Sequence, residues 1–170
     1  HNAKKARTPI VNIVGEHATY HIEFDAPLTA DIEGIARPVS DWVRTSGGTE
    51  SIASDAAEAI AAAKSYPGAI STLILPADIA WGEANGVATV PAQKSPRTVG
   101  EAAVEDCAAA LRSSEPTMLL LGGRALRAPT LEIAGRIAAH SNAAIRSELM
   151  APRTQRGAGR VTAERIPYVV

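Results

Sequence analysis

The sequence predicts an α/β fold, a mostly parallel sheet with flanking helices, and three observations carry this prediction. A β-branched apolar run follows Pro9 at residues 10–14, an alanine-rich amphipathic stretch covers 51–65, and another apolar run lies at 70–75. Short β-branched runs are typical of strands, and apolar residues repeating every three or four positions are typical of helices. Strands and helices that alternate along a chain form a parallel sheet with helices on its faces.

The first part of the chain predicts five elements, each bounded by residues that end regular structure. They are expected at residues 10–14 (strand), 28–36 (helix), 39–45 (edge strand), 51–65 (helix) and 70–75 (strand). Pro38 ends the first helix, because the residue before a proline avoids helical geometry. Gly47 and Gly48 break the chain before the second helix, and Tyr66-Pro67-Gly68 ends it. The small residues of that helix allow close packing on the sheet.

The second part of the chain predicts another α/β unit, with elements at 98–112 (helix), 117–121 (strand), 131–139 (helix) and 143–146 (strand). Thr98 and Glu101 have the spacing of a capping box at the start of the first helix. Cys107 is expected on the inward face of that helix as a buried, unreactive thiol. Pro129 suits the first turn of the next helix. Residues 153–165, rich in arginine and glycine, are expected to form a loop.

A change of composition separates the two parts. Residues 81–97 contain Gly82, Gly86, Pro91 and Pro96, and linkers of this kind often mark domain boundaries. The predicted organisation is therefore a domain at 1–80, a linker at 81–97 and a second domain from 98 to 170.

Composition excludes several classes of partner. The 17 Lys and Arg residues nearly balance the 18 Asp and Glu residues, and aromatic residues make up only 4%. We therefore expect no nucleic-acid partner and no membrane attachment. The single cysteine excludes an intrachain disulfide and suits the reducing cytoplasm. No run reaches the ~20 apolar residues that span a bilayer. The start at His1 and the end at Val170 suggest a piece of a longer sequence.

Polar side chains gather where the first predicted strand ends. Glu16, His17, Tyr20 and His21 follow the β-branched run and Gly15, and chemistry in open α/β sheets gathers beyond the carboxyl ends of strands. The histidine spacing suits a metal only on a helix, so no metal site is predicted. These imidazoles can move protons or bind a substrate carboxylate. Two loop histidines without a role remain the alternative.

Two further segments are weaker candidates for anion binding. Gly122, Gly123 and Arg124 follow a strand and precede a helix, an arrangement that can bring backbone N–H groups to a phosphate. The full dinucleotide pattern is absent, so a tight structural turn is the favoured interpretation. The loop at 153–165 could also bind anions. The favoured interpretations are a solvated loop or a loop that docks on a partner domain.

Several blocks in this order resemble one enzyme family. The blocks are Thr-Pro-Ile-Val-Asn-Ile-Val-Gly at 8–15, Asp-Ala-Pro-Leu-Thr at 25–29, Ile-Ala-Arg-Pro-Val-Ser at 35–40 and Gly-Ala-Ile-Ser-Thr-Leu-Ile-Leu-Pro-Ala-Asp at 68–78. They resemble thiamine-diphosphate-dependent enzymes, in particular acetolactate synthase large subunits and benzoylformate decarboxylase. The Pro-x-Asp turn after a strand is a frequent family feature, and Leu-Leu-Leu-Gly-Gly at 119–123 resembles the start of the central domain.

The resemblance implies domains and cofactors. Residues 1–80 would be the second half of the N-terminal, pyrimidine-binding domain, and residues 98–170 the first part of a Rossmann-like central domain. The parent would use thiamine diphosphate and Mg²⁺, with FAD or ADP at the central domain in some relatives. The glutamate that activates the cofactor would lie before His1. The Gly-Asp-Gly motif that holds the metal and diphosphate is absent from this sequence.

The resemblance also implies roles for individual residues. Glu16, His17 and His21 would be catalytic or would face the substrate, beside Gly15 at the cofactor. Glu16 stands where synthases place a glutamine, and His21 near the histidine pair of decarboxylases, but neither pattern is complete. Gly122, Gly123 and Arg124 would lie at the nucleotide position of the central domain.

The implied parent decarboxylates or ligates a 2-oxo acid as a homodimer or tetramer, and this window alone is expected to be inactive. Two alternatives stay open, a non-catalytic nucleotide-binding or regulatory module and a degenerate relative that serves as a scaffold. Titration with FAD, ADP and NAD would test the first. An upstream glutamate would argue against the second.

Overall fold

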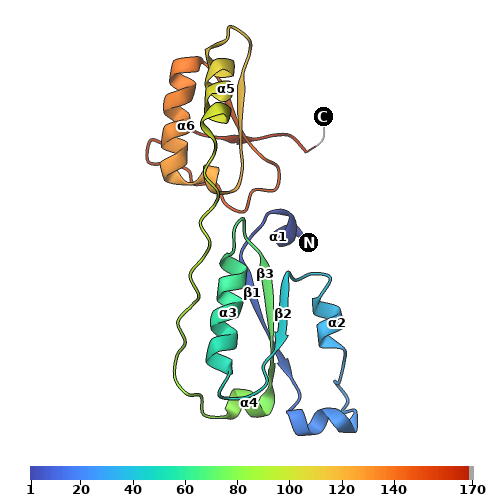
Figure 1. Cartoon of the computed structure of the whole chain (residues 1–170). Coiled ribbons are helices and arrows are strands. Elements are labelled where there is room, and N and C mark those ends of the chain that lie inside the picture. Colours follow the sequence, from blue (N-terminus) through green and yellow to red (C-terminus); the bar gives the residue numbers. More distant parts are fainter. Residues whose placement is uncertain (169–170) are drawn as a thin grey trace. The chain divides into compact units, whose positions relative to one another are not determined.

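The computed structural model describes residues 1–168, which fall into two compact units (Figure 1). The first unit comprises His1–Ser95, and the second begins at Pro96. Residues 83–100 form neither helix nor strand. Each unit contains its own sheet and helices.

The first unit is built on three parallel strands, β1 (Ile10–Glu16), β2 (Trp42–Thr45) and β3 (Ile70–Pro76), in the order β1-β3-β2. The central strand β3 is almost wholly buried, because it has a neighbour on each side and helices over its faces. Its β-branched and leucine-rich sequence matches this position, since strands of parallel sheets are covered on both faces. The second unit is parallel as well, and the predicted α/β class is confirmed.

Helices lie on both sides of the first sheet (Figure 1). The long helix α3 (Ile52–Lys64) packs against β3 through Ala57, Ala59 and Ala63, whose small side chains allow close approach. The short helix α2 (Ile32–Ala36) lies on the other side, as two right-handed crossovers in opposite directions require. The remaining elements are α1 (Asn2–Lys5), the 3₁₀ helix η1 (Thr19–Phe24) and α4 (Ala77–Trp81).

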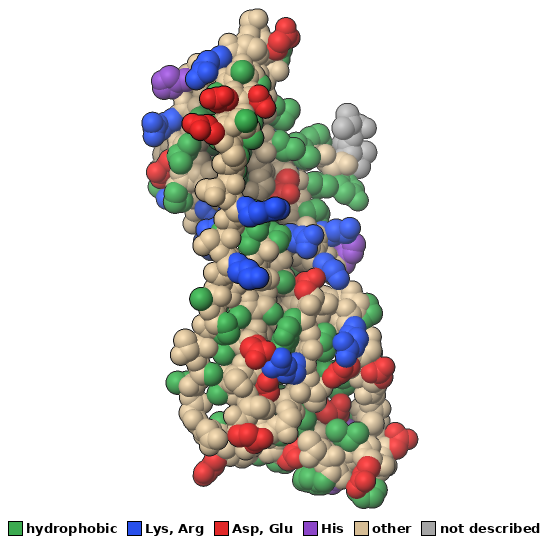
Figure 2. Space-filling model, in the orientation of Figure 1, with side chains coloured by type: hydrophobic (Ala, Val, Ile, Leu, Met, Phe, Trp, Pro, Cys, Tyr) green, Lys and Arg blue, Asp and Glu red, His purple; other side chains and the backbone are tan. Residues whose placement is uncertain are grey.

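The second unit has a smaller parallel sheet in the order β4-β5-β6. Its elements are α5 (Glu101–Arg112), β4 (Met118–Leu121), the 3₁₀ helix η2 (Gly123–Leu126), α6 (Ala128–Ser141), β5 (Ala144–Ser147) and β6 (Glu164–Arg165). Leu126, Leu131, Ala134, Ile145 and Ala163 form its core. Both acidic and basic side chains appear on the face of each unit seen in Figure 2.

The residue at which a helix begins was the feature that the sequence predicted least well. The helix expected from residue 28 begins at Ile32, because the Asp31 carboxylate accepts a hydrogen bond from the Gly34 N–H at 2.8 Å and caps it there. The capping box at Thr98 and Glu101 does not form. Helix α5 begins at Glu101 with Gly100 as its N-cap residue and no side-chain cap.

The prediction that Cys107 is buried was wrong. Cys107 is exposed, because α5 buries none of its residues within the described part of the chain. The stretch 153–165 is loop as far as residue 163, as predicted, but it is not wholly solvated, because Val161 and Ala163 pack on the core of their own unit. Its last residues enter β6, which pairs with β5. Over residues 1–168, no helix combines the length and apolar character needed to cross a membrane.

Candidate active site

The candidate site lies at the carboxyl edge of the first sheet. Strands β1 and β3 run parallel in register, and their last pair is Glu16 with Pro76. The loop after β1 and the first turn of α4 therefore emerge side by side. This is the edge at which open α/β sheets place their ligands.

A cavity of about 380 Å³ opens at this edge. Its lining includes all five residues that the sequence singled out after the first strand, Gly15, Glu16, His17, Tyr20 and His21. Apolar side chains complete the wall, namely Leu28, Ile32 and Trp81. No local pattern predicts that these apolar residues share a cavity with the histidines, because they come from separate segments.

The polar groups of the cavity differ in how well they are satisfied. The Glu16 carboxylate accepts a hydrogen bond from the His17 backbone N–H at 2.7 Å, so it is turned back on its own loop. His17 Nε2 is buried and has no hydrogen-bond partner among residues 1–168. Buried polar atoms are nearly always paired, so this nitrogen is suited to a group from outside the described chain. The rings of Tyr20 and His21 meet edge to face, with centroids 4.6 Å apart.

Asp78 is the residue of this site whose contacts the sequence did not predict. Its carboxylate accepts two hydrogen bonds from Thr19, from the backbone N–H at 3.0 Å and from the hydroxyl at 2.6 Å. The two residues lie 59 positions apart. No local pattern signals such a pair, because it forms only where β1 and β3 are neighbours in the sheet.

No grouping of three or more His, Cys, Asp or Glu side chains within residues 1–168 is arranged to hold a metal ion.

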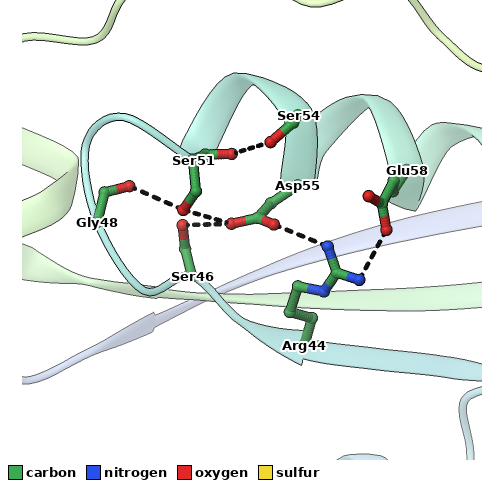
Figure 3. A network of polar contacts seen from close by, with 7 residues as sticks. All are labelled: Arg44, Ser46, Gly48, Ser51, Ser54, Asp55 and Glu58. Carbon is green, nitrogen blue, oxygen red and sulfur yellow. Dashed lines mark hydrogen bonds and ion pairs between the residues drawn. The ribbon is translucent and has the colours of Figure 1, made fainter.

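A polar network ties the carboxyl end of β2 to α3 (Figure 3). The buried Asp55 carboxylate accepts hydrogen bonds from Arg44 at 2.8 Å, from Ser46 at 2.8 Å and from Ser51 at 3.0 Å. Arg44 also pairs with Glu58 at 2.7 Å. Burial favours a higher pKa for Asp55, but the three hydrogen bonds outweigh it and leave the pKa below its ordinary value. None of these residues is in the lining of the cavity, and the network joins β2, a strand of the same sheet, to α3.

The glycine turn of the second unit is closed by a carboxylate. The Gly123 N–H donates a hydrogen bond to Glu148 Oε1 at 2.8 Å, and a side chain at Gly122 would collide with the same carboxylate. Gly123 has φ of +50°, which glycine adopts without strain. Arg124 is exposed. Because the Glu148 carboxylate already accepts the hydrogen bond of the Gly123 N–H, this turn is poorly suited to a nucleotide phosphate.

A larger cavity, of about 800 Å³, lies between α5 and α6 in the second unit. It contains none of the residues predicted to be functional. Leu111, Ile133 and Ile137 form its apolar lining. We therefore place the candidate site in the first unit, where the unsatisfied imidazole lies.

Comparison with solved structures identifies the fold first. The fold matches a solved structure described as "a putative thiamin diphosphate-dependent enzyme isolated from Mycobacterium smegmatis", with a TM-score of 0.70 and 23% identity. The match covers 89% of this chain and 30% of that chain. No protein-family model matches the sequence.

The sequence itself matches "Putative acetolactate synthase large subunit IlvX" of Mycobacterium tuberculosis strain H37Rv, with 45% identity over 169 residues. This covers 99% of the chain but only 32% of the relative, so the chain spans about a third of the relative's length. Together the two matches confirm the predicted resemblance. The sequence is similar to a segment of a protein described as a putative acetolactate synthase large subunit, and its fold is similar to part of a structure described as a thiamin diphosphate-dependent enzyme.

Proposed function

We propose that the chain is part of an enzyme that uses thiamine diphosphate to decarboxylate a 2-oxo acid, and that then releases an aldehyde or joins the product to a second carbonyl. The observation that carries this proposal is the histidine-lined cavity at the carboxyl edge of a parallel sheet. The 45% identity to the acetolactate synthase-like relative supports it.

We further propose that the first unit is the second half of a pyrimidine-binding domain and that the second unit begins the central domain. The break in regular structure over residues 83–100 supports a linker between them. The main motifs for thiamine diphosphate and Mg²⁺ would then lie elsewhere in the parent, since this sequence contains no Gly-Asp-Gly. A cytoplasmic homodimer or tetramer is the assembly that the resemblance favours.

The residues of this chain would form one wall of the active site. Bound thiamine diphosphate would supply the electron sink that lets a 2-oxo acid lose carbon dioxide. His17 lines the cavity, and its buried Nε2 has no hydrogen-bond partner among residues 1–168, which supports a fit to a substrate carboxylate or to a cofactor atom. His21, on the same wall, would move a proton or orient the substrate. Leu28 and Trp81 would give this wall an apolar part.

The test uses the full-length protein, freed of cofactor and then reconstituted with thiamine diphosphate and Mg²⁺. We expect cofactor-dependent release of carbon dioxide from at least one member of a panel of 2-oxo acids. His17→Gln and His21→Gln should each lower kcat by about a hundredfold, the range of general acid–base effects.

His140→Gln is the matched control for this test. His140 is exposed on α6, where its Nδ1 contacts the Arg136 carbonyl oxygen of its own helix at 2.9 Å. The His140→Gln variant should therefore have the kcat of the wild-type protein. Absence of cofactor-dependent carbon dioxide release with every 2-oxo acid would refute the proposal.

The second candidate is a relative without catalysis that keeps the fold as a scaffold. Glu16 supports this alternative, because one oxygen of its carboxylate already accepts a hydrogen bond from the backbone N–H of the next residue, His17. A reconstituted protein that binds thiamine diphosphate but releases no carbon dioxide would favour it.

A further inference from the structure

The loop after β1 enters η1 without a cap of its own. The N-cap position of η1 is Ala18, whose methyl side chain cannot accept a hydrogen bond. The first N–H groups of a helix have no partner within it, and a side-chain acceptor normally satisfies one of them. The N–H of Thr19 is such a group.

Asp78 supplies the missing cap from a different segment. Its two carboxylate oxygens accept hydrogen bonds from the N–H and the hydroxyl of Thr19. These bonds lower the pKa of Asp78 below its ordinary value, so the carboxylate is ionised at neutral pH. Hydrogen bonds to an ionised acceptor are stronger than those between neutral groups.

The loop after β1 is held at both ends, by strand pairing where it begins and by the Asp78 cap where η1 starts. Glu16 is held in register with Pro76 by strand pairing, and Thr19 is held by Asp78. Only His17 and Ala18 lie between these two anchors. Ala18 is 4% exposed, and His17, which lines the cavity, has a buried Nε2 that no hydrogen bond within residues 1–168 holds in place.

We propose that Asp78 is a positioning residue that, through Thr19, holds the His17 imidazole inside the cavity. The effect on the loop stands on the geometry alone, and its consequence for catalysis rests on the proposed function. Because neither Asp78 nor Thr19 lines the cavity, neither needs to touch the substrate for this role.

The first measurement is the rate at which diethyl pyrocarbonate labels each histidine of the cofactor-free, full-length protein, read by mass spectrometry. The reagent acylates neutral imidazoles that are accessible. Asp78→Ala should label His17 about tenfold faster than wild type, because two hydrogen bonds that close the loop are lost. Thr19→Val, which removes only the hydroxyl bond, should give a smaller increase. Thr19→Ser should behave as wild type.

Hydrogen exchange separates this local effect from general destabilisation. Residues 17–24 should exchange faster in Asp78→Ala, whereas the amides of α3 should keep their protection. Glu83→Ala removes a nearby exposed carboxylate that accepts no hydrogen bond within the described residues, and it should leave both readouts unchanged. Exposed His140 serves as the internal standard for labelling.

Unchanged labelling of His17 and unchanged exchange of residues 17–24 in Asp78→Ala would overturn the proposal. If Asp78→Ala does not fold, Thr19→Val decides, and wild-type labelling in that variant overturns the proposal as well. Histidine labelling can be measured in a protein without activity. A protein that releases no carbon dioxide would therefore contradict the proposed function but not the role proposed for Asp78. In an active protein, kcat/KM should fall in the order of His17 labelling and should be retained in Thr19→Ser.

Discussion

At the scale of single residues, Asp55 shows how a buried charge is made tolerable. The carboxylate is 5% exposed as a residue, and burial alone would penalise its ionised form. Arg44, Ser46 and Ser51 supply three hydrogen bonds, which reverse the direction of the pKa shift. An aspartate with a lowered pKa in the folded state stabilises that state above its ordinary pKa of 3.8, and the contribution is lost as pH falls.

We therefore expect Asp55→Asn to destabilise the full-length protein at pH 7 by about 1–2 kcal/mol, since one acceptor and the ion pair with the partly exposed Arg44 are lost. The difference from wild type should shrink between about pH 5 and pH 3, as Asp55 becomes protonated in wild type. Denaturant titrations at several pH values measure both effects. Asp106→Asn, a change on the exposed surface of α5, should show neither.

The sequence could predict which residues of the candidate site lie together only where they are close along the chain. Glu16, His17 and His21 could be placed together because they follow one β-branched run, and the cavity contains all three. Their roles remain predictions. The contact between Thr19 and Asp78 could not be predicted, because it depends on strand order and register. Those follow from packing between segments and leave no local pattern.

At the scale of elements, the turn before β3 depends on Gly68. Its φ is +133°, a conformation that side chains rarely adopt, and an added Cβ would collide with the carbonyl oxygen of Arg7. The turn therefore brings the segment before β1 against the start of β3. The pairing of the Ile10 N–H with the Ala69 carbonyl, at 3.1 Å, follows directly from this approach.

Gly68→Ala should destabilise the first unit by about 2 kcal/mol, because backbone strain and a backbone collision act together. Gly47→Ala is the matched control, since nothing lies within 4 Å of its added Cβ and its φ is not positive. The midpoints of chemical denaturation of Gly68→Ala and Gly47→Ala measure this difference in stability. Equal midpoints would contradict the role assigned to Gly68.

Helices and strands were predicted well where the apolar pattern and the residues that end regular structure agreed. The helix expected at 51–65 forms as α3, because a long alanine-rich face lies between Gly47-Gly48 and Tyr66-Pro67-Gly68. The helix starts at 28 and 98 were wrong, because the first turn depends on which side chain captures the free N–H groups. Asp31 captures one of them in α2, and no side chain does so in α5.

At the scale of the whole molecule, the two units differ in what their strand ends offer. The first leaves an imidazole nitrogen without a partner at the carboxyl edge of its sheet. The second closes the corresponding turn with Glu148, which accepts the hydrogen bond of the Gly123 N–H. The sequence predicted both edges but could not predict this difference, because Glu148 reaches the turn from beyond β5.

We expect the full-length protein to bind neither FAD nor ADP through the turn at Gly122 and Gly123. Titration followed by flavin fluorescence and calorimetry should show no saturable binding. Glu148→Gln removes the negative charge and should be the variant in which weak binding emerges, whereas Glu132→Gln on exposed α6 should not change the result. Protection of residues 122–124 from hydrogen exchange by either nucleotide in the wild-type protein would contradict this expectation.

The bond between Thr19 and Asp78 also bears on how such enzymes can be recombined. Substrate range in an enzyme of this kind would be altered most simply by grafting the loop after β1 from a relative. Because the anchor of that loop lies 59 positions away, a graft that carries residues 17–24 alone separates the loop from its partner. A transplant should therefore exchange the turn at Asp78 together with the loop, and in inherited sequences the two positions should change as a pair.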